Sequence, residues 1–179
     1  MHHSTNKICR RERGAALVTS LLMLLVMTVL GLAAMQVTRM EERMAGNSRD
    51  VNVAFQGAEA GLRDSEELIR VMTSRPGTCG SLGCGGIYQL GLLASDLRDQ
   101  DDAWWVANGR EYGVAGTKEM TEATRDPRTV TDDMGFISDS LTVGHGPPEG
   151  RNFYRITSSS TGASATANVI VESTYTRRF

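Results

Sequence analysis

The sequence predicts an α+β protein in which one long N-terminal α-helix packs on a small C-terminal antiparallel β-sheet. An uncharged apolar run over residues 15–35 indicates the helix, and apolar residues at helical spacing continue from there to Pro76. Alternating apolar and polar residues over 152–159 and 165–176 indicate the sheet, since they flank the turn sequence SSTGAS. The 179 residues leave room for one compact domain beside such a helix.

The first part of the helix is apolar on every side, because residues 15–35 read AALVTSLLMLLVMTVLGLAAM. At a rise of 1.5 Å per residue, this run spans roughly 30 Å, the thickness of the hydrocarbon core of a bilayer. Residues 1–14 before it are basic, with four cations and one acidic side chain: Lys7, Arg10, Arg11, Arg13 and Glu12. Basic residues favour the cytoplasmic side, so we expect the rest of the chain to lie across the membrane. The run alone also fits a plain single-pass membrane anchor.

The second part of the helix is amphipathic. Its apolar stripe has helical spacing and consists of Met40, Met44, Val51, Phe55, Ala58, Leu62, Ile69 and Met72. The opposite face is charged and holds Glu41, Glu42, Arg43, Arg49, Asp50, Arg63, Asp64, Glu66 and Glu67. We expect one helix over residues 15–75, with a transmembrane or filament-core part over 15–37, and we expect the sheet to bury the stripe from Phe55 to Met72. A filament subunit needs such an extension to pack on its neighbours and to support its own domain, whereas a plain anchor does not.

Residues 76–179 are expected to form a globular head domain. Within it, we expect a short helix over 88–100 and short strands over 104–116. The polar region 117–150, which Pro and Gly punctuate, is expected to be a loop.

No residue pattern predicts catalysis, a metal or a cofactor. Four acidic residues crowd together but lack the Gly and the distal Glu of a calcium loop, so we expect a solvated acidic loop at Asp96, Asp99, Asp101 and Asp102. The neighbours Trp104 and Trp105 are expected to anchor a core rather than to form a binding surface, and the isolated His145 is expected to be exposed. The 19 Lys and Arg balance the 21 Asp and Glu, so no nucleic-acid partner is expected.

Both ends of the sequence resemble a known family. The letters RRERG over residues 10–14, directly before Ala15, resemble the leader and cleavage point of type IV prepilins. The stretch RGAALVTSLLMLLVMTVLGLAAMQ, followed by MEERMAGNSRDVNVAFQGAEAGLRDSE, resembles the N-terminal region of PilX-type minor pilins over residues 10–67. The closing stretch from Phe153 to Tyr175 resembles the C-terminal end of the same family.

This resemblance implies a type IV pilin-like fold. It also implies that a prepilin peptidase removes residues 1–14 by cutting the Gly14–Ala15 bond, and that Ala15 becomes the methylated N-terminus. The head would lie in the periplasm while the helix sits in the bacterial inner membrane, and the protein would later be part of a pilus at the cell surface. The implied role is to initiate pilus assembly, in support of adhesion and twitching motility. The implied partners are other minor pilins, the major pilin, a tip adhesin, the inner-membrane assembly platform and the prepilin peptidase.

One position departs from the family pattern. Most pilins carry a glutamate fifth after the cut, which is thought to pair with the free amine of the subunit ahead, whereas this chain has Thr19. An unpaired charge in hydrocarbon is costly, so a subunit without the carboxylate cannot neutralise an amine ahead of it. We therefore expect the protein at the filament tip, with no subunit ahead. Alternatively, Thr19 hydrogen-bonds adequately or incorporation is inefficient.

Two other functions stay open at this point. A type II secretion pseudopilin of the tip-located K type also lacks the glutamate, although that type normally carries a much larger helical domain. A membrane-anchored periplasmic sensor or binding domain would keep its leader.

The cysteines agree with a periplasmic head. Cys9 lies in the leader and is lost on cleavage, which leaves Cys79 and Cys84 as a pair in an oxidising compartment. We expect a Cys79–Cys84 disulfide that staples a segment too rich in Gly to order itself. A zinc site is not expected, because two cysteines without a nearby His supply half of the ligands.

Overall fold

The structure is a computed structural model that describes residues 13–93, 96–113, 119–139 and 149–179. The predicted leader up to Glu12, with Cys9, and the predicted exposed His145 lie outside these ranges. The chain divides into two compact units, Met1–Gly46 and Asn47–Phe179, and each is described by itself.

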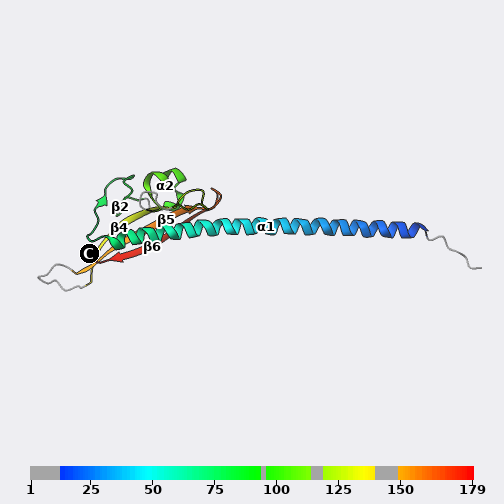
Figure 1. Cartoon of the computed structure of the whole chain (residues 1–179), viewed down its shortest axis with the longest axis horizontal. Helices are drawn as coiled ribbons and strands as arrows, with labels where there is room; N and C mark the ends of the chain where they lie inside the picture. The colour runs from blue at the N-terminus through cyan, green and yellow to red at the C-terminus, as the bar shows by residue number, and fades with distance from the viewer. Residues whose placement is uncertain (1–12, 94–95, 114–118, 140–148) are drawn as a thin grey trace, which may run out of the picture. The chain divides into compact units, whose positions relative to one another are not determined.

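Helix α1 spans Arg13–Val71, close to the predicted range of 15–75, and it runs from blue to green in Figure 1. In the first unit, every helical side chain from Gly14 to Gly46 is exposed. Among the described residues, α1 is the one helix that is long and apolar enough to cross a membrane. The helix ends before Pro76, and the guanidinium of Arg177 donates to the carbonyl of Ile69, one of the last acceptors of the helix.

The second unit is built on a mixed β-sheet. Its strands are β1 (Thr78–Cys79), β2 (Ile87–Gln89), β3 (Arg110–Glu111), β4 (Arg128–Ser138), β5 (Gly150–Thr161) and β6 (Asn168–Arg177). The strand order is β1-β2-β4-β5-β6, with β3 also paired to β4. The predicted antiparallel pairing holds for β3 to β6 and includes the predicted β5–β6 hairpin. The pairs β1–β2 and β2–β4 are parallel. The predicted α+β, pilin-like fold is confirmed.

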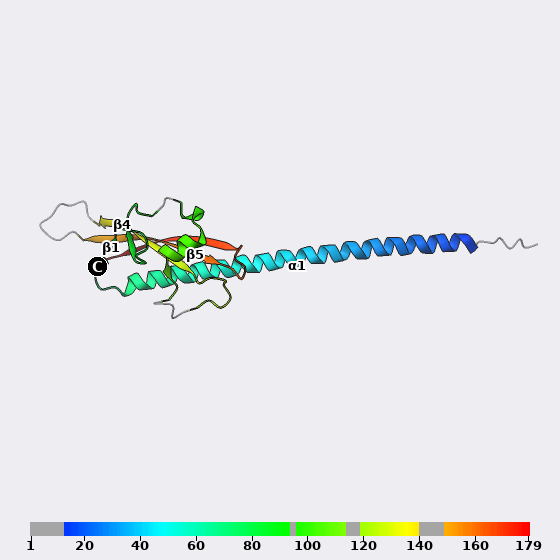
Figure 2. The same ribbon diagram turned by 90° about the horizontal axis from the view of Figure 1, so that it is seen from above.

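The sheet separates two apolar clusters, and Figures 1 and 2 show α1 on one side of it and helix α2 (Asp102–Asn108) on the other. The α1-side cluster consists of Leu62, Ile69, Ile87, Tyr154 and Ile156. The outer cluster lies under α2 and the 3-10 helix η1 (Leu97–Asp99), and consists of Tyr88, Leu93, Leu97, Trp105 and Val130. Val171 packs on the first cluster and Ile170 on the second, as the alternation along β6 predicts.

Helix α1 approaches β5 closely through residues with almost no side chain. Its contact face in the second unit holds Ala54, Gly57, Ala58, Gly61 and Ser65. A Cβ added at Gly61 would lie 2.5 Å from Oγ of Ser158 and 3.1 Å from side-chain carbons of Pro127 and Thr129. A Cβ at Gly57 would collide with the side chain of Ser160. The Oγ of Ser65 donates to Oγ1 of Thr129 at 2.8 Å. Larger residues on this face would push the helix off the sheet.

The observed contact differs from the prediction that the sheet buries the apolar stripe from Phe55 to Met72. Leu62 and Ile69 are buried as predicted, and Met72 is half-buried against the same cluster. The prediction is wrong at Phe55, whose side chain is 45% exposed, and Val51 of the same apolar stripe is 50% exposed. The covered face is shifted toward the small residues: it keeps Ala58, Leu62 and Ile69 of the stripe and adds Gly57 and Gly61, which allow the close approach.

The elements predicted around the tryptophans are only partly right. The region 88–100 holds the end of β2 and the single turn η1 rather than a helix. The region 104–116 begins in α2, and its one strand in the described residues is the short β3. Asp101 caps α2, since its carboxylate accepts the backbone N–H of Trp104 at 2.8 Å. Trp105 is fully buried, so the prediction that this pair anchors a core is confirmed.

The predicted loop 117–150 is wrong over β4, which crosses its middle. A β-bulge between Asp133 and Gly135 explains why no alternation is visible in the sequence. Gly135 has φ +101°, a conformation that favours glycine. Asp133 pairs with Tyr154, and Phe136 pairs with Asn152. The residues of β4 on the α1 side of the sheet are therefore odd-numbered before the bulge and even-numbered after it.

Replacing Gly61 with Val should destabilise the head by about 1–3 kcal/mol, because the new side chain overpacks the contact with β5. Both tryptophans lie in α2, so Trp fluorescence of the intact protein in detergent follows unfolding of the head. We expect Tm to fall by roughly 5 °C. Gly46→Val is the matched control, because nothing lies within 4 Å of a Cβ at that helix position. Equal shifts in the two variants would contradict the close contact.

Candidate functional site

Three predicted site residues lie in the first turns of α1. Gly14, Ala15 and Thr19 are exposed, and nothing described lies within 4 Å of a Cβ at Gly14. The Oγ1 of Thr19 lies 3.1 Å from the carbonyl oxygen of Ala15 and 3.0 Å from that of Ala16, so the hydroxyl donates within its own helix. At this position the helix therefore presents a satisfied neutral group and no charge.

The uncharged stretch that begins at Ala15 continues to Thr38, and the first charged residue after it is Arg39. Further hydroxyls in the stretch are satisfied in the same way as Thr19. Ser20 donates to the carbonyl of Leu17 at 2.9 Å and Thr28 to that of Leu25 at 2.8 Å. Because these hydroxyls need no outside partner, this surface of the helix is compatible with lipid or with neighbouring apolar helices.

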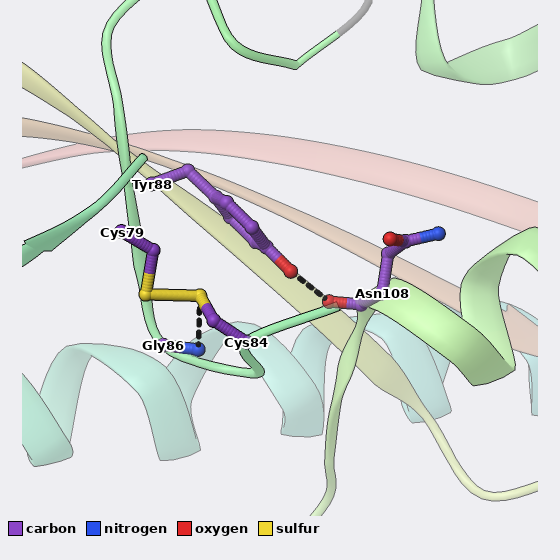
Figure 3. The surroundings of a disulfide bond; sticks show 5 residues. All are labelled: Cys79, Cys84, Gly86, Tyr88 and Asn108. Carbon is purple, nitrogen blue, oxygen red and sulfur yellow. Dashed lines mark hydrogen bonds between the residues drawn. A yellow bond between two sulfur atoms is a disulfide. The ribbon is translucent and has the colours of Figure 1, made fainter. Parts of the chain in front are cut away.

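The two remaining predicted site residues lie in the second unit, where Cys79 and Cys84 form the predicted disulfide (Figure 3). Cys79 belongs to β1 and packs on the outer cluster, while Cys84 is exposed. The backbone N–H of Gly86 points to Sγ of Cys84 at 3.4 Å. Close by, the hydroxyl of Tyr88 donates to the carbonyl of Asn108 at 2.6 Å and ties β2 to the end of α2.

Asp50 forms a clasp that the sequence analysis missed. Its carboxylate accepts the backbone N–H of Ser164 at 3.0 Å and also the hydroxyl of Ser164, which fixes the β5–β6 turn to α1. Gly162 gives the carboxylate its space, because a Cβ there would collide with Asp50. These hydrogen bonds, above all the one from the Ser164 hydroxyl, lower the pKa of Asp50.

Two more residues of the predicted charged face of α1 also contact the head. Asp64 accepts from the guanidinium of Arg110 at 3.0 Å and from the backbone N–H of Gly113 at 3.2 Å. Glu66 accepts the hydroxyl of Ser173 on β6 at 2.8 Å. Helical periodicity places such residues opposite an apolar stripe, so it cannot identify these contacts.

Buried carboxylates on β4 tie the sheet together. Asp132 pairs with Arg155 on β5, and Asp133 accepts from Arg75, after the end of α1, at 2.8 Å. Burial raises the pKa of Asp132, and the hydrogen bond from Arg155 acts in the opposite direction. The same bond raises the pKa of Arg155. Both arginines lie far from β4 in sequence, so these pairs fix the tertiary arrangement.

Within the residues described, no group of three His, Cys, Asp or Glu side chains could hold a metal ion. The features found here are a lipid-compatible helix surface, a disulfide and a set of polar contacts that hold the head. They suit a structural and assembly role.

Asp50→Asn should reduce the stability of the head at neutral pH and change how that stability depends on pH. The pKa of Asp50 is lowered in the folded protein, so its contribution is present above the unfolded pKa of about 3.9 and is lost as pH falls through the lowered value. The difference in Tm between wild type and variant should stay constant above about pH 5 and shrink in acid. Asp99→Asn, at an exposed acid of η1, is the control and should show no such trend. A difference that grows in acid would contradict the clasp.

Comparison with known proteins identifies the family. The model described as PilX N-terminal matches residues 13–63, and the model described as Type IV pilus assembly protein PilX C-term matches residues 59–177. The second model alone covers more than half of the chain, and the two together include both the apolar part of α1 and the head. No curated protein and no solved structure matches the chain. The chain belongs to the PilX family of type IV pilus assembly proteins.

Proposed function

We propose that this protein is a minor pilin that initiates type IV pilus assembly from the inner membrane. The observation that carries the proposal is the uncharged surface of α1 from Ala15 to Thr38, in a chain that belongs to a pilus assembly family. Such a surface can reside in lipid and can later pack against the apolar helices of other subunits. The periplasmic head, the contacts with other minor pilins, the major pilin, a tip adhesin and the assembly platform, and the support of adhesion and twitching motility all belong to this proposal.

Maturation at the Gly14–Ala15 bond is the first step of the proposed mechanism. Four cations precede Gly14, and no charged side chain follows it until Arg39, so cleavage by the prepilin peptidase removes the charged side chains that would hinder lateral movement into a bundle of helices and leaves only the new terminal amine. Gly14 itself is small and exposed, which suits the narrow active site of a peptidase. Ala15 then carries the new, methylated amine.

Thr19 supports a position at the filament tip. A charged amine in a water-poor helix bundle needs a carboxylate close by, and Thr19 offers none to a subunit ahead. Its hydroxyl donates to the carbonyl of Ala15 or Ala16, so it is already used within the helix. A subunit with this residue is best placed at the end of the filament, where no other subunit lies ahead of it. Its own amine would still be available to the carboxylate of the subunit behind.

Gly14→Glu should block maturation, since a bulky acid at the cleavage site cannot enter the peptidase as glycine does. Mass spectrometry should find the leader still attached, and a strain that carries only this variant should yield few sheared pili. Gly31→Ala is the control, because that helix position is also exposed with nothing within 4 Å of a Cβ. Full rescue of piliation by Gly14→Glu would contradict the mechanism. A wild-type protein that keeps its leader would favour a plain anchor.

Thr19→Glu should move the protein from the tip into the shaft, because the new carboxylate can pair with the amine of a subunit ahead. Immunogold labelling of sheared pili should show wild-type protein at filament ends and Thr19→Glu also along the shafts. Thr19→Val is the neutral control and should stay at the ends. Wild-type label spread evenly along shafts would exclude the tip position.

A further inference from the structure

Strand β1 is an unusual edge of the sheet. It has two residues, and it pairs parallel to β2 through Thr78 with Ile87 and Cys79 with Tyr88. Only residues 80–86 connect the two strands. Parallel neighbours normally need a crossover of about a dozen residues or more, so this pairing is not one that the backbone readily adopts alone.

Besides the disulfide and the β1–β2 pairing, the contacts described for this segment include the Arg75–Asp133 ion pair before β1 and the packing of Cys79 on the outer cluster. No residue from 73 to 86 is buried, and five of its residues are glycines: Gly77, Gly80, Gly83, Gly85 and Gly86. Gly83 and Gly85 have φ of +82° and +65°. The Cys79–Cys84 bond closes the loop that contains Gly83, Gly85 follows directly after this loop, and a Cβ at Gly86 would approach Sγ of Cys79 to 3.2 Å. Figure 3 shows the bond beside the chain that leads into β2.

The segment covers apolar surface at the end of α1. A cavity of about 190 Å³ lies between them, with Ile69 and Met72 on the α1 side and Gly77, Gly85 and Gly86 on the loop side. Ile87 of β2 also lines the cavity and is buried. If β1 left the sheet, the cavity would open and the edge of β2 would become free to accept another strand.

We propose that the Cys79–Cys84 disulfide is a local redox switch that decides whether β1 stays on the sheet. The oxidised form keeps β1 paired with β2 and the cavity covered. In the reduced form β1 is released and the edge of β2 is open, while the rest of the head stays folded. The reduced form retains the bond from Tyr88 to Asn108, the Asp132–Arg155 pair and the long pairings of β4, β5 and β6.

The chemistry is a thiol–disulfide exchange with a dithiol as reductant. One thiolate of the dithiol attacks Sγ of Cys84, the exposed cysteine, and the bond to Cys79 breaks so that Cys79 leaves as a thiolate. The second thiol of the dithiol then attacks the mixed disulfide and releases Cys84. The dithiol becomes a disulfide, the protein gains two electrons, and the two protons of the dithiol end on Cys79 and Cys84.

Hydrogen exchange followed by mass spectrometry tests this switch on the intact protein in detergent. All variants carry Cys9→Ser, so that Cys79 and Cys84 are the only cysteines. Oxidised protein is compared with protein reduced by dithiothreitol and with the Cys79→Ser, Cys84→Ser double variant. On reduction, amides of residues 78–86 should exchange about 40-fold faster, the effect expected when a loop of about six residues loses its cross-link. The double variant should match the reduced protein, and peptides from β4, β5 and β6 should not change.

Three outcomes would overturn the proposal. Unchanged exchange on reduction would mean that noncovalent contacts hold β1. Faster exchange throughout β4 to β6 would mean that the bond staples the whole head. Failure of oxidised glutathione to restore protection would mean that the change is not a switch. The measurement does not use piliation, so its result is independent of the proposed role in the pilus.

Discussion

Gly57 and Gly61 present only hydrogen atoms to β5, and this determines how close α1 can lie to the sheet. On β5, the short side chains of Ser158 and Ser160 face these glycines, and both serines are fully buried. The bulky core residues lie farther along the helix, at Leu62 and Ile69, where the cluster with Tyr154 and Ile156 begins. The buried helix face therefore has its smallest residues where β5 lies closest and larger ones beside the cluster, and this match of sizes fixes the register of helix against sheet. It also explains why Phe55, one turn before Ala58 on the apolar stripe, stays outside.

Polar contacts also hold the strands, turns and helix of the head in place. Aromatic residues make up only 6% of the chain, so the core is modest. Asp132 and Asp133 on β4 reach to β5 and to the segment after α1, Asp50 holds the β5–β6 turn, and Arg177 caps the end of the helix. Buried ion pairs add little net stability compared with apolar residues of the same volume, but removing one partner is costly. Their value here lies in specifying one arrangement of strands around the helix.

The parts of the fold that could be predicted from sequence are those encoded by local periodicity or spacing. The uncharged run, the amphipathic continuation, the β5–β6 hairpin and the cysteine pair are of this kind. The resemblance to PilX-type minor pilins agrees with the family matches over both halves of the chain. In the candidate site, Gly14, Ala15 and Thr19 could be chosen only through that resemblance, because the roles proposed for them concern contacts with other proteins.

The parts that could not be predicted depend on distant partners. The sequence of strand β4 resembles a loop for two reasons. Its carboxylates at Asp132 and Asp133 pair with arginines that are distant in sequence, and its bulge at Gly135 breaks the alternation. Residues 104–116 were predicted to form short strands, whereas α2 occupies the first part of this region, and the capping signal at Asp101 before Trp104 was not used. Periodicity also finds an apolar face without saying which of two neighbouring faces the sheet will cover. Asp50 was placed on the solvent face for that reason.

The distance from Ala15 to the first charge at Arg39 has a mechanical consequence. At 1.5 Å per residue, the uncharged residues 15–38 extend about 36 Å, while the hydrocarbon layer of a bilayer is about 30 Å thick. The helix is thus longer than the layer by about one turn, and it can tilt to fit. If the leader is removed as proposed, the subunit could also rise by about one turn toward the head side without drawing a side-chain charge into the lipid. This spare length of uncharged helix would lower the free-energy barrier to the first part of extraction from the membrane.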